Sequence, residues 1–153
     1  MNIFDELAQQ YYEIDNQYST KEFEARAKGW NRKEEYWGRK RVINDEAYFL
    51  FMFTRLEGRI KQLSDALIIS KKGSITHWKT RGPWDILPTG SNAKISFKNR
   101  LALLTDKSRS DFSLATRYYE DRNSLAHGGN FTRAVNMVTV INDMQRLYID
   151  LKP

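Results

Sequence analysis

"NDEAYFLFMFTRLEGRIKQLSDALIIS", residues 44 to 70, is the longest stretch of helical periodicity in the chain. Its large apolar residues recur every three or four positions, as on one face of a helix: Phe49, Phe53, Leu56, Ile60, Leu63 and Leu67. The spacing predicts a long central helix with Asn44 or Asp45 as its N-cap. A second apolar face in its first half predicts burial on two sides, by a neighbouring helix or a second subunit; this face is formed by Tyr48, Phe51 and Met52.

Shorter helical patterns precede this stretch. The apolar residues from 2 to 18 recur at helical spacing, and Ser19 or Thr20 can cap a second short helix that ends near Lys28. Residues 31 to 40 resemble another short helix.

Further helices follow it. One begins at Ser91 or Asn92 and places Phe97, Leu101 and Leu104 on one face, and the next runs from Ser110 or Asp111 to His127. The last begins near Asn130 and is expected to bury four residues: Ala134, Val138, Ile141 and Leu147. Glycines and prolines break residues 71 to 92 into a long loop. No stretch alternates as a strand does, so the sequence predicts an all-α bundle.

The composition suits one domain. With 153 residues, 41% of them hydrophobic, the chain can bury one ordinary core, so we expect a single domain of residues 1–153. The absence of cysteine excludes a disulfide scaffold and any thiolate site, and it fits a cytoplasmic protein. The start "MNIFDELAQQ" does not have the pattern of a secretory signal, and "AYFLFMF" is shorter than a membrane span.

The formal net charge of +6 is unevenly placed. Basic residues gather between 26 and 41, punctuated by Trp30 and Trp37, and again between 71 and 100, punctuated by Trp78 and Trp84. Charge combined with base stacking is typical of RNA binding, and Lys79, Arg81, Trp78 and Trp84 are the candidate contacts. A solvated surface with tryptophans that anchor helix ends would give the same pattern. His77, in this second region, is expected to be a surface residue and not a catalyst, and it could contact RNA.

"DRNSLAHGG", residues 121 to 129, holds the candidate chemistry. Arg122 interrupts the apolar stripe of its helix, and Asn123 and His127, four residues apart, share a face with Tyr119 one turn earlier. Gly128 and Gly129 suit a left-handed C-terminal cap. The helix dipole favours a protonated imidazole at a C-terminus, which keeps His127 usable in proton transfer near neutral pH.

Cleavage of a phosphodiester needs a base, an acid and a cation that stabilises the charge on the phosphoryl oxygens. One chain supplies one such histidine. If this helix packs against its two-fold mate, both copies of His127 and Arg122 line one cleft. The ribose 2′-hydroxyl would be the nucleophile and RNA the substrate, and the sequence has no cluster of metal ligands, so neither a metal nor another cofactor is expected.

The pattern Arg122-Asn123-x-x-x-His127 followed by glycine, in the next-to-last helix of an all-α chain, resembles the signature of HEPN domains (higher eukaryotes and prokaryotes nucleotide-binding), in particular the RiboL-PSP-like ribonuclease branch. The resemblance covers about residues 43 to 152. It implies a bundle of four to five core helices over residues 43–152, with an N-terminal helical extension over 1–42. It also implies that Arg122 and His127 form the catalytic pair, that Asn123 supports them, and that two subunits form one RNA cleft.

Members of this family are commonly metal-independent endoribonucleases in toxin–antitoxin, antiphage and CRISPR-linked systems, so an antitoxin or regulatory protein is an implied partner. In the branch that pairs with nucleotidyltransferase antitoxins, a tyrosine stands two residues after the histidine. Here Gly129 stands at that position.

Alternatives to each assignment stay open. His127 can simply cap its helix by bonding a terminal carbonyl, with the Arg122 stem on apolar surface and Asn123 in solvent. The chain would then be a non-catalytic HEPN-like module that dimerises, binds RNA or docks a protein. A general basic RNA chaperone without a defined cleft is a third interpretation.

The central helix carries two further candidates. Glu57 lies in its buried half, where a carboxylate needs a partner, so we expect it either to orient Arg122 or to pair with Lys61. Gly58 costs helix stability relative to alanine and hints at a close approach of another helix, in the core or at a dimer interface.

Overall fold

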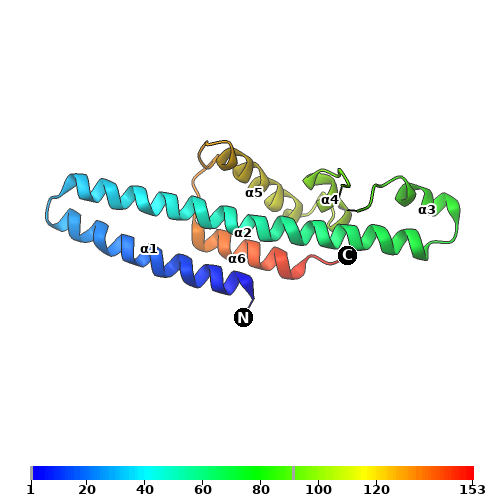
Figure 1. Cartoon of the computed structure of the whole chain (residues 1–153), viewed down its shortest axis with the longest axis horizontal. Helices are drawn as coiled ribbons and strands as arrows, with labels where there is room; N and C mark the ends of the chain where they lie inside the picture. The colour runs from blue at the N-terminus through cyan, green and yellow to red at the C-terminus, as the bar shows by residue number, and fades with distance from the viewer. Residues whose placement is uncertain (1, 91) are drawn as a thin grey trace. The chain divides into compact units, whose positions relative to one another are not determined.

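The computed structural model describes residues 2–90 and 92–153, and these residues form six helices (Figure 1): α1 Ile3–Ala27, α2 Asn31–Ser74, α3 Trp78–Asp85, α4 Phe97–Leu104, α5 Ser110–Ala126 and α6 Met137–Asp150. No strand occurs in these ranges, so the predicted all-α class is confirmed. None of the helices in the described ranges has both the length and the apolar character that a bilayer crossing requires.

The chain divides into two compact units. The first unit consists of Met1–Phe53 and Glu120–Gln145, and the second of Thr54–Tyr119 and Arg146–Pro153. The expected boundary between residues 42 and 43 falls inside α2, which passes it without a break. The single domain of residues 1–153 stays a prediction.

In the first unit, α1 and the start of α2 form an antiparallel hairpin (Figure 1). Asn2 caps α1 by accepting from the backbone N–H groups of Phe4 at 2.8 Å and Asp5 at 3.1 Å. The predicted break at Ser19 or Thr20 is wrong, because the Thr20 hydroxyl donates to the Asn16 carbonyl at 2.9 Å inside a continuous helix. The chain turns at Gly29, whose φ of +66° favours glycine.

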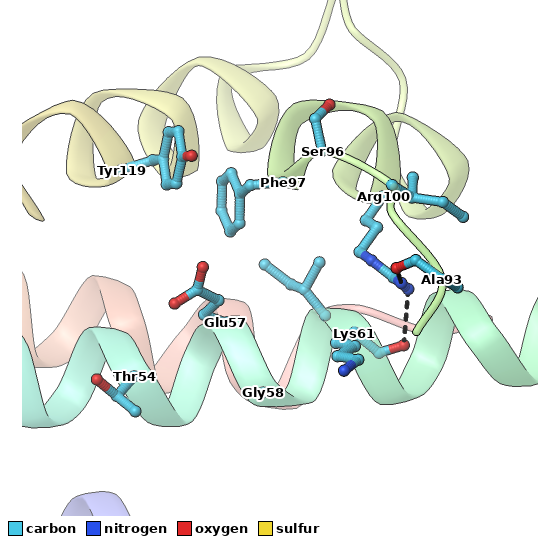
Figure 2. Close-up of a pocket in the computed structure, with 11 residues that line it drawn as sticks. Thr54, Glu57, Gly58, Lys61, Ala93, Ser96, Phe97, Arg100 and Tyr119 are labelled. Atoms are coloured by element: carbon cyan, nitrogen blue, oxygen red, sulfur yellow. Dashed lines mark hydrogen bonds between the residues drawn. The ribbon is translucent and has the colours of Figure 1, made fainter. Parts of the chain in front are cut away.

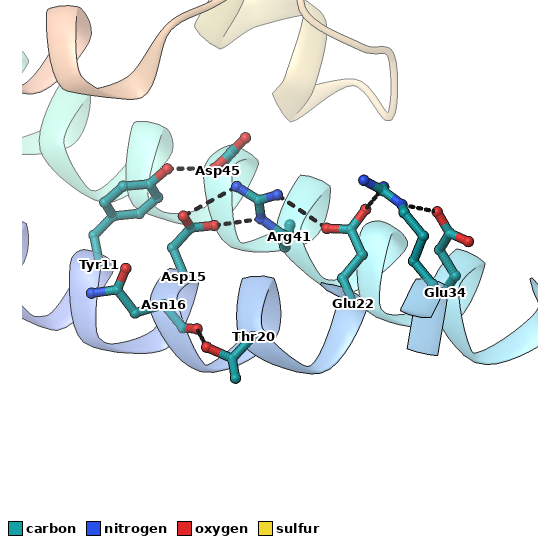
Figure 3. Close-up of polar contacts among 9 residues, drawn as sticks. Tyr11, Asp15, Asn16, Thr20, Glu22, Glu34, Arg41 and Asp45 are labelled. Atoms are coloured by element: carbon teal, nitrogen blue, oxygen red, sulfur yellow. Dashed lines mark hydrogen bonds and ion pairs between the residues drawn. The ribbon is translucent and has the colours of Figure 1, made fainter. Parts of the chain in front are cut away.

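A seam of polar contacts joins α1 to α2, and we call Tyr11, Asp15, Glu22, Arg41 and Asp45 the polar seam (Figure 3). Arg41 bonds Asp15 at 2.9 Å and Glu22 at 3.0 Å, and the Tyr11 hydroxyl donates to Asp45 at 2.8 Å. Burial, and then the bond to Asp45, raise the pKa of Tyr11. Burial also raises the pKa of Asp45, against the lowering effect of the Tyr11 bond.

The polar seam explains why the predicted break before the central helix is wrong. Residues 31 to 40 and 44 to 70 belong to one 44-residue helix, α2. Asn44 and Asp45 have the side chains of N-caps, but they bond across to α1: Asn44 is buried and donates to the Tyr11 carbonyl at 3.5 Å, and Asp45 accepts from the Tyr11 hydroxyl.

The predicted apolar stripe of α2 is largely confirmed. Phe49 and Phe53 are buried in the first unit, and Leu56, Ile60 and Leu63 in the second; Leu67 is half-buried while Ile68 is buried. On the second predicted face, Tyr48 and Met52 are buried, but Phe51 is 57% exposed. The close approach predicted at Gly58 is not found within the described part of the chain, since a Cβ there would have no atom within 4 Å apart from the helix's own neighbouring backbone; an approach at a dimer interface stays a prediction.

The C-terminal half differs from prediction at the helix starts. The predicted loop over 71–92 contains the end of α2 and all of α3. Helix α4 begins at Phe97 with Ser96 as its N-cap, not at Asn92, and Ser91 lies outside the described residues. Helix α6 begins at Met137, so Ala134 lies before it and is exposed, and Val138 is 50% exposed. Ile141 and Leu147 are buried as expected.

Candidate functional site

Helix α5 ends as the sequence predicts. Gly128 has a φ of +78°, and its N–H donates to the Leu125 carbonyl at 3.0 Å while the Gly129 N–H donates to the Ser124 carbonyl at 2.9 Å. These two bonds form a Schellman motif. A Cβ at Gly129 would lie 2.6 Å from the Ser124 hydroxyl oxygen and 3.0 Å from its carbonyl oxygen. A larger residue at this position would therefore require the Ser124 side chain to move.

The three candidate catalytic residues lie in the first unit at this helix end. Arg122 is half-buried, and its Nη1 donates to Asn123 Oδ1 at 3.0 Å, so the half-buried Asn123 does not simply face solvent. His127 is exposed. Its imidazole forms no hydrogen bond with any residue in 2–90 or 92–153, so the helix is ended by the glycines and not by an imidazole bond to a carbonyl.

Asp121, next to Arg122, is a structural residue of this helix end that sequence reasoning missed. Its side chain is 0% exposed, and its Oδ1 accepts from the backbone N–H of Thr132 at 3.0 Å and from the Thr132 hydroxyl. Its Oδ2 pairs with Arg133 at 2.8 Å. A signal was present in the sequence, since Asp121 follows Ala115 and Tyr118 at steps of three on the buried face of α5.

Two further contacts hold the segment that follows the motif. The Ser124 hydroxyl donates to the Asn130 carbonyl at 2.6 Å, and the Phe131 ring meets the Phe49 ring edge to face at 5.1 Å. Together with Asp121, they fix residues 130 to 133 against α5 and α2 within the first unit. The irregular segment after the two glycines is therefore anchored at several points.

A cleft of about 350 Å³ opens beside the glycines of the motif. Helix α2 and the end of α5 line it with Arg39, Ile43, Glu46, Ala47, Leu50, Leu125, Gly128, Gly129 and Asn130. Arg39, which is exposed, is the basic residue among those that line this cleft. The sequence placed Arg39 in a basic region but gave no reason to associate it with the motif.

The two predicted supporting residues lie in the second unit. Glu57 is half-buried and points into a cleft of about 520 Å³, and Tyr119 lines the same cleft and stacks on Phe97 with ring centroids 4.5 Å apart (Figure 2). The predicted bond between Glu57 and Arg122 is not tested, and it stays a prediction, as does the supporting role of Tyr119.

Arg100, which the sequence placed in the second basic region, does not belong to the basic surface. It is only 5% exposed and bonds Asp65 at 2.6 Å and the Ser64 hydroxyl at 2.8 Å. Its Nη1 also reaches the Lys61 carbonyl at 3.5 Å (Figure 2). Its charge is therefore satisfied inside the second unit.

The four candidate RNA contacts all belong to α3. Trp78 is 67% exposed with the Lys79 ammonium 5.7 Å from its ring centre, Arg81 pairs with Asp85 at 3.0 Å, and Trp84 is half-buried. His77 is exposed at the N-cap position, as expected. Binding of RNA by this helix stays a prediction.

Within the ranges that the structure describes, no three His, Cys, Asp or Glu side chains are grouped as metal ligands would be. Comparisons of the chain with protein-family models, curated proteins and solved structures gave no match. Functional inference therefore depends on the chemistry of the residues themselves.

Proposed function

We propose that this chain is a metal-independent endoribonuclease of the HEPN type that cleaves RNA as a homodimer. One observation carries the proposal. The half-buried Arg122 guanidinium is held by the Asn123 amide oxygen at 3.0 Å, and an exposed histidine follows at the end of the same helix. This combination offers a fixed cation and an accessible proton carrier, which are the two requirements for phosphodiester cleavage without a metal.

In the proposed reaction, His127 of one protomer takes the proton of the ribose 2′-hydroxyl, and the oxygen attacks the adjacent phosphorus. The bond from phosphorus to the 5′-oxygen breaks, and the leaving oxygen takes a proton from the protonated His127 of the second protomer. The products are a 2′,3′-cyclic phosphate and a 5′-hydroxyl. Arg122 stabilises the charge that develops on the phosphoryl oxygens.

Exposed apolar residues on α2 support dimerisation. Ile43 is 45% exposed and Phe51 is 57% exposed, and their spacing of eight residues places them on one helix face in the first unit. Ile43 also lines the cleft beside Gly128 and Gly129. A second subunit that covers this face would bury apolar surface next to the motif. By its resemblance to HEPN ribonucleases, the enzyme would act in a toxin–antitoxin or antiphage context.

Cleavage of total RNA and tRNA in EDTA tests the proposal. The wild-type protein is expected to leave cyclic phosphate ends. His127→Ala removes both the base and the acid of the dimer and should lower activity by at least roughly 10²- to 10⁴-fold, the usual contribution of one such group. Arg122→Ala should lower it by roughly 10²- to 10³-fold, the usual loss when one group that stabilises the charge of the transition state is removed. His77→Ala is the matched control for the chemical step, because His77 is also an exposed histidine beside a helix end; it should leave the cleavage rate at saturating RNA unchanged, whereas a contact of His77 with RNA would alter only the affinity.

Intact RNA across these substrates, from a protein that sediments as a folded dimer, would favour the non-catalytic module instead. Cleavage that survives His127→Ala, or that requires added metal, would contradict the proposed mechanism. Full activity in a protein that sediments only as a monomer would contradict the shared cleft.

A further inference from the structure

The closed end of the α1–α2 hairpin, in the first unit, holds an aromatic cleft of about 370 Å³. Its lining consists of Lys21, Glu24, Ala25, Trp30, Lys33, Tyr36 and Trp37. A volume of this size lies within the range of small-molecule sites. The cleft is separate from the residues assigned to cleavage.

Backbone bonds fix the position of Trp30 at the turn. Its N–H donates to the Ala25 carbonyl at 2.8 Å, and its carbonyl accepts from the N–H groups of Lys33 at 2.9 Å and Glu34 at 3.0 Å. The indole nevertheless stays 46% exposed, and the neighbouring Tyr36 ring is 53% exposed. Trp30 therefore anchors a helix end and still presents its ring to solvent, so the anchoring role alone does not account for it.

Lysine ammonium groups lie over the rings of this cleft: two lie over Trp30, and one lies over Trp37, whose ring also packs against Tyr18 and Tyr36. Lys33 and Lys28 lie 4.1 Å and 4.7 Å from the centre of the Trp30 ring, and Lys21 lies 4.5 Å from the centre of the Trp37 ring. An exposed cation–π contact is weak, and the lysine stem is flexible. The ring faces can therefore be uncovered at little cost, which frees the ammonium groups to bind elsewhere.

These lysines also lack acidic partners. At this end of the hairpin, Glu34 is bonded by Arg26 at 2.6 Å, and Glu22 is bonded by Arg26 and Arg41. Across 2–90 and 92–153, neither Lys21, Lys28 nor Lys33 forms an ion pair with a carboxylate. Within these ranges, the cleft lining contains one carboxylate, that of Glu24, and the ammonium groups of two lysines, Lys21 and Lys33. The cleft thus combines ring faces with a surplus of mobile positive charge.

We propose that this hairpin cleft binds single-stranded nucleic acid, with one base stacked on Trp30 and the flanking phosphates bound by Lys21, Lys28 and Lys33. Stacking requires an open aromatic face, and phosphate binding requires cations that can move to it. An acidic peptide would use the lysines but leave the ring faces without stacking partners. The proposal does not depend on cleavage, because none of these residues belongs to the Arg122–His127 motif.

Fluorescence anisotropy of a labelled single-stranded oligoadenylate tests this site, with the full chain carrying His127→Ala so that the probe stays intact. Trp30→Leu is expected to weaken binding by roughly 5- to 150-fold, the range measured for loss of one stacked base. Trp30→Phe keeps a ring and should retain most of the affinity. Phe23→Leu is the matched control, since Phe23 is a 69% exposed aromatic of α1 outside the cleft.

The salt dependence tests the lysines. Three phosphate contacts predict a slope of about −2 for the logarithm of the binding constant against the logarithm of salt concentration, and Lys33→Gln should reduce its magnitude by about 0.7. Lys107→Gln, at an exposed site in the second unit, should leave the slope unchanged. Circular dichroism checks that each variant keeps its helix content.

Three results would overturn the proposal. The first is no binding of oligoadenylate at low salt. The second is equal binding by Trp30→Leu and Phe23→Leu. The third is Trp30-dependent binding of an acidic peptide or of vesicles containing phosphatidylserine, without binding of the oligonucleotide. The binding experiment measures affinity, not cleavage, and compares changes at Trp30 and Lys33 within the His127→Ala background, so either proposal can fail without the other.

Discussion

Asp121→Ala should be among the most destabilising single substitutions near the motif. The change removes a fully buried carboxylate together with its two bonds from Thr132 and its ion pair with Arg133. Bonds to a charged group contribute about 1.5–3 kcal/mol each. The Arg133 side chain is 34% exposed and can regain water, so we assign little to the ion pair itself. The expected loss is about 3–5 kcal/mol.

Asp121→Asn separates shape from charge. The asparagine keeps an oxygen for both Thr132 donors but loses the charge, which roughly halves the strength of such bonds, so about 1–2 kcal/mol should be lost. A chain of this size changes its melting temperature by about 2–4 °C per kcal/mol. Thermal unfolding followed by circular dichroism should therefore show a drop of roughly 10 °C for Asp121→Ala and roughly 4 °C for Asp121→Asn.

Asp106→Ala is the control for this prediction. Asp106 also accepts from one backbone N–H and one hydroxyl, both of Ser108 and both at 2.8 Å, but it is exposed. Removal of the Asp106 carboxylate should lower the free energy of unfolding by less than about 1 kcal/mol, because water can accept from the two Ser108 donors in its place. Equal melting temperatures for the Asp121→Ala and Asp106→Ala variants would refute the argument that the Asp121 bonds contribute more to stability because they are buried.

Three further predictions concern other parts of the chain. Gly58→Ala should stabilise the protein by about 0.5–1 kcal/mol, because a Cβ at this position meets nothing within 4 Å. Gly129→Ala should destabilise the protein, because its Cβ would contact Ser124. Melting temperatures of the two variants that shift in the same direction would contradict these expectations. Burial raises the pKa of Asp45, so ionisation of this carboxyl opposes folding: its contribution to stability is complete below about pH 4 and is lost as the pH rises through the folded pKa. Asp45→Asn keeps the oxygen that accepts from Tyr11 but does not ionise, so the variant should not show this loss of stability. Urea midpoints of the wild type and the variant that change in parallel from about pH 4 upward would contradict the prediction. Phe51→Ser should weaken the proposed dimer in sedimentation velocity while leaving the melting temperature of the monomer nearly unchanged, since the ring is 57% exposed; an unaltered dimer would place the interface elsewhere.

The sequence predicts well where local signals act alone. Periodicity and the two glycines locate α5 and its left-handed end, because both depend on residues within a few positions of one another. Helices α4 and α6 begin at Phe97 and Met137, several residues after the starts that the sequence predicts. Cap-forming side chains are common enough that a pattern alone cannot choose among neighbouring candidates.

The sequence does not predict the role of a side chain whose bonding partner is distant along the chain. Thr20, Asn44 and Asp45 have the side chains of N-caps, yet the structure uses them in mid-helix, where two of them bond the opposite helix of the hairpin. The role of Asp121 depends on Thr132 and Arg133, 11 and 12 residues later in an irregular segment that has no pattern of its own. The assignment of Arg122 and His127 to catalysis stays a prediction for the cleavage assay.

The polar seam also has a consequence for the order of folding. Contacts across the hairpin join residues 8 apart for Arg26 and Glu34, then 19, 26 and 34 apart for the bonds of Arg41 to Glu22, Arg41 to Asp15 and Tyr11 to Asp45. Each contact thus closes only a short additional loop once the one before it has formed, so the hairpin can zip outward from Gly29. The bond from Gln145 to Asp5 spans 140 residues and must form late. During synthesis, the hairpin and its basic, aromatic end can therefore assemble while α5 and α6 are still absent.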